Sequence, residues 1–279
     1  MTLMRPDRIA AALLIAAVAL SACGRKDEEK APAGPDGTGP APAAQTAAAA
    51  GAPFNFAQKT AAAEVSLKLP TALSSEPDLH ASLYSDGVKD LRAFLDGAQA
   101  SRAEEEGALE GDAAGSAPPY ARALEWAKAG ETGKLLSLKQ TVYEYTGGAH
   151  PNTAYGAVIW DKAMKRPVTP ASLFRRGADY AALDRALCAA IEAAKSERLG
   201  QTVSMAEGGW TCPTWRDSLF VLAASDQPGK AGGVTFLYGP YQIGPYAEGG
   251  YEVTVPQSVF RAALAPAYAD EFAGRPVKR

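Results

Sequence analysis

A stretch made almost entirely of alanine, proline and glycine, Ala31 to Pro53, constrains most strongly what this chain can fold into. Asp36 is its only charged residue. Such a stretch has nothing large to bury, so burial cannot offset the entropy that it would lose on folding. We therefore predict a flexible tether here and a folded part from about Phe54 to Arg279. That length is enough for one sizeable core or two small subdomains.

The residues before the tether have the pattern of an export signal. Arg5 and Arg8 are followed by an uncharged apolar run from Ile9 to Leu20. A basic start, a short apolar stretch and small residues before a cleavage point are typical of a secretory signal. The run is shorter than the roughly 20 apolar residues that a membrane-spanning helix needs. We predict that residues 1–22 are a signal peptide.

The end of this signal has a cysteine in a specific context, Leu20-Ser21-Ala22-Cys23. The motif resembles the lipobox of bacterial lipoproteins, in which the cysteine is acylated and becomes the first mature residue. The resemblance implies a lipid anchor on Cys23, strong enough for stable attachment to a membrane. Gly24, where retained lipoproteins usually have Asp, favours the outer membrane, with the domain facing the periplasm. The alternative is an ordinary signal peptide followed by a cysteine without a lipid.

Net charge and cysteine content limit the kinds of partner and the kinds of covalent bond that we expect. The formal net charge is −3 and no basic stripe is visible, which argues against a nucleic-acid partner. With Cys23 acylated, Cys188 and Cys212 remain as an even pair in an oxidising compartment. We expect a disulfide between them. Two buried free thiols are the alternative.

The folded part contains patterns of both strands and helices. Alternating or β-branched runs predict strands, and apolar residues at helical spacing predict helices. The strands are expected at Glu64–Leu69, Leu136–Tyr145, Thr153–Asp161, Leu219–Ala223, Val234–Tyr238 and Tyr251–Val255. The helices are expected from Pro77 to about Ser101, over Tyr180–Leu199, and from Gln257 to Leu264 with Pro256 as the entry residue. The interspersed order predicts an α+β fold with a mostly antiparallel sheet and packed helices. Its two subdomains would be 54–139 and 140–279.

Two motifs are more specific than composition. They are Tyr143-x-Tyr145-Thr146-Gly147-Gly148-Ala149-His150-Pro151-Asn152 and Tyr238-x-x-Tyr241-x-Ile243-x-x-Tyr246-Ala247-x-Gly249. In this order the pair resembles the domain-of-unknown-function family 3298. The region from Phe54 to Lys139 is similar to family 4163, its usual upstream companion.

The resemblance implies that the protein is a binding or accessory module, and it does not indicate a particular reaction. Such domains form the extracellular part of the lysozyme-sensing anti-sigma factor RsiV and precede the catalytic domain of the peptidoglycan deacetylase PdaC. Others are stand-alone envelope lipoproteins. No His-x-x-x-His motif of a polysaccharide deacetylase is present. We therefore expect a non-catalytic envelope lipoprotein that binds cell-wall glycan, such as peptidoglycan, or a protein such as lysozyme.

The motifs also supply the candidate ligand-binding residues: Tyr145, Gly147, Gly148, His150, Asn152, Tyr241 and Tyr246. His150 has three interpretations. Its ring caps the glycine turn, it contacts a ligand, or it is a general base beside a carboxylate such as Asp161. The first is favoured, and we predict that residues 147–151 pack against the segment from Tyr238 to Gly249, with any ligand contact secondary.

The alternatives to a binding module are two. One is a cell-wall hydrolase or deacetylase that uses His150, and the other is a structural lipoprotein that maintains envelope integrity. No catalytic residue is assigned with either. His80 and His150 are the only histidines and lie far apart in the sequence, so we predict no metal site and no cofactor.

Overall fold

The computed structural model describes residues 52–108 and 118–277, which belong to one compact unit. The predicted signal peptide, Cys23 and most of the predicted tether lie outside the described residues. Within those residues, no helix combines the length and the apolar character that crossing a membrane requires.

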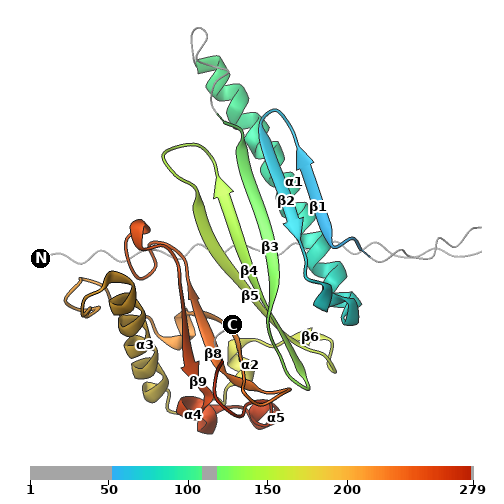
Figure 1. Cartoon of the computed structure of the whole chain (residues 1–279). Helices are drawn as coiled ribbons and strands as arrows, with labels where there is room; N and C mark the ends of the chain where they lie inside the picture. The colour runs from blue at the N-terminus through green and yellow to red at the C-terminus, as the bar shows by residue number, and fades with distance from the viewer. Residues whose placement is uncertain (1–51, 109–117, 278–279) are drawn as a thin grey trace, which may run out of the picture. The chain divides into compact units, whose positions relative to one another are not determined.

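Two sheets and the helices beside them make up the unit (Figure 1). The first sheet has six strands in sequence order: β1 (Asn55–Lys59), β2 (Ala63–Lys68), β3 (Tyr120–Glu131), β4 (Leu135–Tyr145), β5 (Asn152–Asp161) and β6 (Arg166–Pro167). The second has three: β7 (Leu219–Ala224), β8 (Ala231–Tyr238) and β9 (Tyr251–Pro256). Neighbouring strands are antiparallel except β2 and β3, which are parallel. The predicted α+β class is confirmed.

Helix α1 (Pro77–Ala108) covers one face of the first sheet. A parallel strand pair needs a long crossover connection, and α1 lies in the segment between β2 and β3. Along β2, Val65 and Leu67 are buried against the helix, while the alternate residues Glu64, Ser66 and Lys68 are exposed. Gly87 lets α1 approach closely, because an added Cβ would lie 3.0 Å from the Leu67 side chain.

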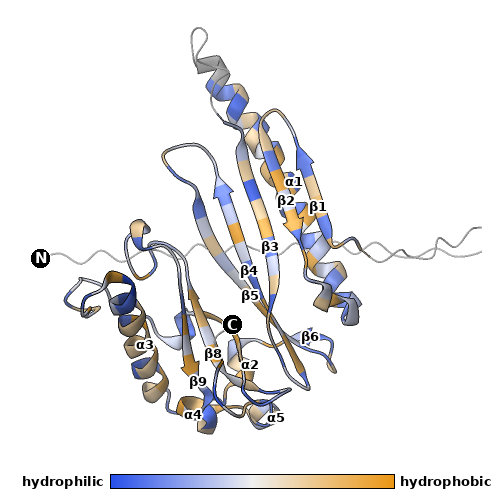
Figure 2. Cartoon of the chain, in the orientation of Figure 1, coloured by the Kyte–Doolittle hydropathy of each residue, from blue (hydrophilic) through white to orange (hydrophobic). Residues whose placement is uncertain are grey.

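Helix α3 (Ala181–Leu199) covers the second sheet and builds the other core. Its apolar stripe of Leu183, Leu187 and Ile191 is buried, and Gly200 ends the helix in the left-handed conformation that favours glycine. Figure 2 shows hydrophobic residues along α3, β8 and β9. Shorter helices complete the unit: α2 (Pro170–Leu173), α4 (Gln257–Phe260) and α5 (Pro266–Ala269), with 3-10 turns at Thr71–Ser75, Trp215–Asp217, Tyr246–Glu248 and Arg261–Ala263.

The second sheet packs on one end of the first. The Leu222 amide of β7 donates to the Ser137 hydroxyl of β4 at 3.0 Å. An added Cβ on Gly130 of β3 would lie 2.7 Å from the Leu222 carbonyl oxygen, so the strands meet without room for a side chain. The Lys139 ammonium also bonds Glu252 of β9 at 2.6 Å.

Several expectations need correction. Strands β1 and β3 were not expected, and α1 continues to Ala108 beyond its expected end near Ser101. Pro256 is the last residue of β9 and not the first of a helix, and α4 gives way to a 3-10 turn at Arg261. The expected subdomain boundary between residues 139 and 140 falls inside β4.

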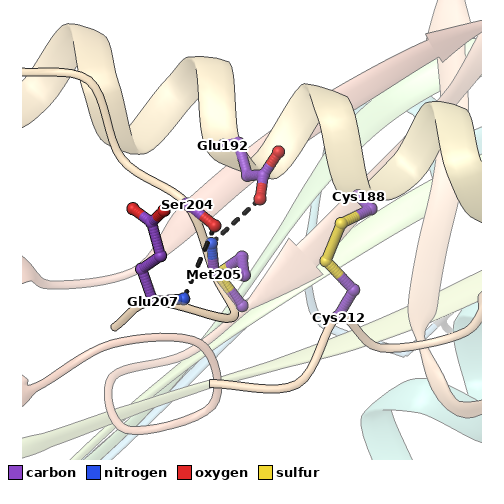
Figure 3. The surroundings of a disulfide bond; sticks show 6 residues. All are labelled: Cys188, Glu192, Ser204, Met205, Glu207 and Cys212. Atoms are coloured by element: carbon purple, nitrogen blue, oxygen red, sulfur yellow. Dashed lines mark hydrogen bonds between the residues drawn. A yellow bond between two sulfur atoms is a disulfide. The ribbon is translucent and has the colours of Figure 1, made fainter. Parts of the chain in front are cut away.

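The expected disulfide is confirmed, and the alternative of two buried free thiols is therefore wrong. Cys188 of α3 is bonded to Cys212, in the segment after the helix, with a Cα–Cα distance of 5.4 Å (Figure 3). One helical turn further on, the Glu192 carboxylate accepts from the Met205 amide at 2.9 Å. The bond and this hydrogen bond together hold the segment after α3 against the helix.

Candidate functional site

The turn between β4 and β5 has the backbone that its glycines predict. Gly147 and Gly148 have φ of 90° and 86°, a region that side-chain-bearing residues rarely adopt. Nothing lies within 4 Å of a Cβ added to Gly148, so conformation rather than space requires glycine there. The turn brings His150 to the surface of the unit.

The turn packs against the second motif, as predicted. The rings of His150 and Tyr246 are stacked, with centroids 3.7 Å apart and planes at 18°. The Tyr246 hydroxyl donates to the Pro151 carbonyl oxygen at 2.7 Å, and His150 Nδ1 lies 3.1 Å from the same oxygen. His150 is nevertheless exposed. The ring therefore caps the turn at the surface of the unit and not in the core.

Tyr241 extends this aromatic surface. Its ring centroid is 5.6 Å from that of Tyr246, and 58% of the residue is exposed. Its φ is 69°, in the left-handed region where a bulky side chain is strained. We call His150, Tyr246 and Tyr241 the aromatic surface.

Two further tyrosines, one in the second motif and one just after it, have a different role. Tyr238 and Tyr251 are buried in the core beside α3. The Tyr238 hydroxyl pairs with the Ser218 hydroxyl at 2.8 Å, and burial raises the pKa of Tyr238 to about 12. The motif therefore divides into buried rings that hold the fold and surface rings on the loop between β8 and β9.

The remaining candidates lie on either side of the turn. The Tyr145 hydroxyl donates to the Gly148 carbonyl oxygen at 3.4 Å, and Asn152 Oδ1 accepts from the Thr153 amide at 3.0 Å. Tyr145, Gly148 and His150 line one side of a shallow depression of about 410 Å³ beside the turn.

A buried ion pair that sequence analysis missed supports the loop between β8 and β9. The Lys195 side chain of α3 is 3% exposed and that of Glu248 is 12% exposed. The Lys195 ammonium donates to Glu248 Oε2 at 2.5 Å and to the Ile243 carbonyl oxygen at 2.8 Å. Lys195 follows Ile191 by four residues, so it continues the apolar stripe of α3. A lysine at that position is the signal that could have revealed the pair.

The surroundings of Glu248 favour its charged form. Burial by itself opposes ionisation, but hydrogen bonds from Lys195 and from the Tyr251 hydroxyl outweigh it, and the pKa of Glu248 is lowered. For Tyr251, burial and the bond to the Glu248 carboxylate raise the pKa to about 12. Arg198 donates to the carbonyl oxygens of Glu248 and Gly250 and lies 3.8 Å from the centre of the Tyr251 ring. Helix α3 therefore fixes the loop that carries Tyr241 and Tyr246.

The pairing of His150 with Asp161 is wrong. His150 precedes β5 and Asp161 ends it, and a strand of this length spans about 30 Å. Asp161 is buried and accepts from the amides of Ala163 and Met164 and from the Tyr268 hydroxyl. Its carboxylate therefore stabilises the turn after β5 and does not orient His150.

Potential metal ligands have other partners. His80 is buried in α1, stacked on Phe54, with Nε2 3.2 Å from the Pro53 carbonyl oxygen. Among the residues that the structure describes, Cys188, Glu192 and Cys212 are a group whose ligand atoms lie within 4.8 Å of one another, which sequence spacing did not reveal. The two sulfur atoms are joined as a disulfide, so in this state the group lacks thiolate ligands (Figure 3).

Comparisons with known proteins agree with the fold. Residues 56–153 match the family described as Deacetylase PdaC, and residues 171–258 match Protein of unknown function (DUF3298). The glycine turn, which the resemblance assigned to the second family, falls in the first match. A solved DUF3298 structure from Bacteroides fragilis has a TM-score of 0.54 and 20% identity, over 78% of this chain and 93% of that one. A DUF3298 structure from Pseudomonas aeruginosa has a TM-score of 0.49 and 18% identity, over 79% and 94%.

Curated relatives match a smaller part. The Immunogenic proteins MPB64 of Mycobacterium bovis and MPT64 of Mycobacterium tuberculosis are 31% identical over 124 residues, 44% of this chain. The chain spans about half the length of these relatives, 50% in each case. Residues 171–258 therefore match the DUF3298 family, and residues 56–153 match the family named Deacetylase PdaC.

Proposed function

We propose that this protein is a non-catalytic binding module that holds sugar rings of cell-wall glycan on the aromatic surface. The observation that carries the proposal is the series of three neighbouring rings, His150, Tyr246 and Tyr241, at the surface of the unit. Aromatic faces with polar tips suit both stacking and hydrogen bonding to a ligand with an apolar ring face and polar edges.

The backbone of Tyr241 supports a role in binding over a role in packing. Strained conformations of non-glycine residues cost roughly 1–3 kcal/mol and cluster at functional sites. A packing role would bury the ring to offset that cost, whereas Tyr241 is 58% exposed. We infer that the strain is retained because it presents the ring to a ligand.

The proposal includes the cell envelope as location. The lipobox-like motif at Cys23 and the tether after it support a domain anchored by lipid in the outer membrane and facing the periplasm. The name of the upstream family, Deacetylase PdaC, supports N-acetylated glycan as the ligand class. The separation of His150 from Asp161 argues against the catalytic alternative.

The test is retention of the full-length protein, in detergent, on insoluble peptidoglycan. We expect binding by the wild type, loss of most binding in Tyr246→Ala and Tyr241→Ala, and wild-type binding in Tyr84→Ala, a control on α1. Equal retention of all four proteins would contradict the proposal. Binding of lysozyme without binding of glycan would assign a protein partner instead.

A further inference from the structure

The face of the first sheet that points away from α1 is open beside the aromatic surface. Side chains along β2 alternate, so Val65 and Leu67 face α1 while Glu64 and Ser66 face the opposite side and are exposed. One row of residues in register crosses this open face from β1 to β5: Ala57, Ser66, Ala123, Tyr143 and Thr153. Small side chains occupy most of the row, and Tyr143 stands above them.

Two shallow depressions on this face are continuous. One, of about 490 Å³, is lined by Ala57, Ser66 and Ala123. The other is the depression of about 410 Å³ beside Tyr145 and His150. Glu64, Ala121 and Tyr143 line both. Together they form a trough that crosses from β1 to the glycine turn after β4, and three strand spacings make its length about 14 Å.

We propose that this trough binds further sugar rings of the same glycan chain, with Tyr143 as an additional stacking platform. The inference rests on the proposed function and extends it, since the aromatic surface would hold one part of the chain and the trough the next. Tyr143 is 40% exposed and shares the second depression with His150, whose ring stacks on Tyr246. The glycan chain would therefore pass from one aromatic side chain to the next without leaving the protein surface.

The chemistry of the trough favours a neutral, hydroxyl-rich chain as its occupant. Its floor of Ala57, Ser66, Ala121 and Ala123 offers none of the deep pockets in which protein partners bury their anchoring side chains. The charged residues that line it are paired with charges of opposite sign, Lys59 with Glu64 and Arg122 with Asp90 and Glu144. Paired charges offer no net attraction to a polyanion or an anionic membrane, yet they provide hydrogen-bond donors and acceptors for hydroxyl groups.

The same face is covered where it lies farther from the turn. Lys139 of β4 bonds Glu252 of the second sheet, and Ser137 accepts from Leu222. The second sheet therefore leaves free the half of the face that adjoins the aromatic surface, as a continuous binding site requires.

The experiment compares a disaccharide and a hexasaccharide of β-linked N-acetylglucosamine as ligands of the full-length protein in detergent. We expect the wild type to bind the hexasaccharide more tightly. Tyr143→Ala should weaken hexasaccharide binding about fivefold to tenfold, the contribution of one stacked ring, and leave disaccharide binding unchanged. Ala57→Arg, which fills the trough from an exposed position on edge strand β1, should do the same. Ala93→Arg, exposed on α1, is the matched control and should change neither.

The outcomes separate the two proposals. Wild-type hexasaccharide binding in both Tyr143→Ala and Ala57→Arg would overturn the trough, while loss of both ligands in Tyr246→Ala would still support the aromatic surface. Equal affinity of the wild type for the two ligands would also overturn the trough. If the wild type binds neither ligand, the proposed function fails and the trough fails with it.

Discussion

The aromatic surface has two supports of opposite character. His150 in the glycine turn is exposed, its ring stacks on Tyr246, and His150 Nδ1 and the Tyr246 hydroxyl both bond the Pro151 carbonyl oxygen. The ion pair of Lys195 and Glu248 is buried and fixes the loop that carries Tyr241 and Tyr246. Exposed contacts compete with water and contribute little, whereas a buried charge without its partner is costly. The difference indicates that the turn shapes the binding surface and the ion pair holds it in place.

The largest expected effect comes from breaking the buried pair. Lys195→Met leaves the Glu248 carboxylate buried without its cation, and we expect it to lower the free energy of unfolding by about 3 kcal/mol or more. Urea denaturation measures this. The double variant Lys195→Met, Glu248→Gln should recover part of the loss because no charge is then orphaned. A loss below about 1 kcal/mol in the single variant would contradict a structural role for the pair.

A slightly smaller effect is expected from the disulfide on the same helix. Cys188 and Cys212 are 24 residues apart, and closing a loop of this length contributes about 3 kcal/mol in the chain-entropy model. Replacing both cysteines with alanine should lower the urea midpoint by the corresponding amount. Because neither cysteine belongs to the aromatic surface, glycan binding by the folded variant should be unchanged. Loss of binding at equal folded fraction would show that α3 transmits the constraint to the loop.

The pH dependence of stability should report the ion pair separately. The pKa of Glu248 is lower in the folded protein than in the unfolded chain, so its contribution is fully present above the unfolded value of about 4.3. That contribution should be lost as the pH falls below this value and through the folded pKa. Glu248→Gln should therefore flatten the stability curve in this window. Identical curves for the variant and the wild type would show that the ion pair does not contribute to stability in this pH range.

The smallest effect is expected at the turn. His150→Ala removes an exposed ring, so we expect a cost in stability of about 1 kcal/mol or less, the contribution of one aromatic stack. His150→Phe retains the stack and should restore most of the stability. Thermal denaturation of the three proteins measures both. A loss of several kcal/mol in His150→Ala would mean that the turn, and not the ion pair, is the main support.

Much of the fold could be predicted from local patterns. Strand β9 alternates and helix α3 has the helical periodicity that its burial requires, while β4, β5, β7 and β8 are runs rich in apolar, β-branched or aromatic residues. Strand β3 was not predicted because alanine, which favours strands only weakly, occupies much of its more exposed face. The strand β1 is short and mostly exposed, so burial imprints no clear alternation on it.

The candidate site shows the same division. The positive φ of Gly147 and Gly148 and the packing of the turn on Tyr246 could be predicted from the motifs. Glycine in a turn indicates positive φ, and aromatic residues in a paired motif indicate that their rings pack together. The partner of Lys195 could not, because Glu248 is distant in sequence and only the packing of α3 on the loop brings the two together. The pairing of His150 with Asp161 failed for a related reason, since proximity in sequence along an extended strand means separation in space.

Tyr241→Gly tests most directly the claim that the aromatic surface exists for binding. Glycine adopts a φ of 69° without strain, so the variant should be at least as stable as the wild type. It lacks the exposed ring, so calorimetric titration with the N-acetylglucosamine hexasaccharide should show at least a fivefold loss of affinity, about the value of one stacked ring. The account predicts this combination of retained stability and lost binding. Unchanged affinity, or a clear loss of stability, would contradict it.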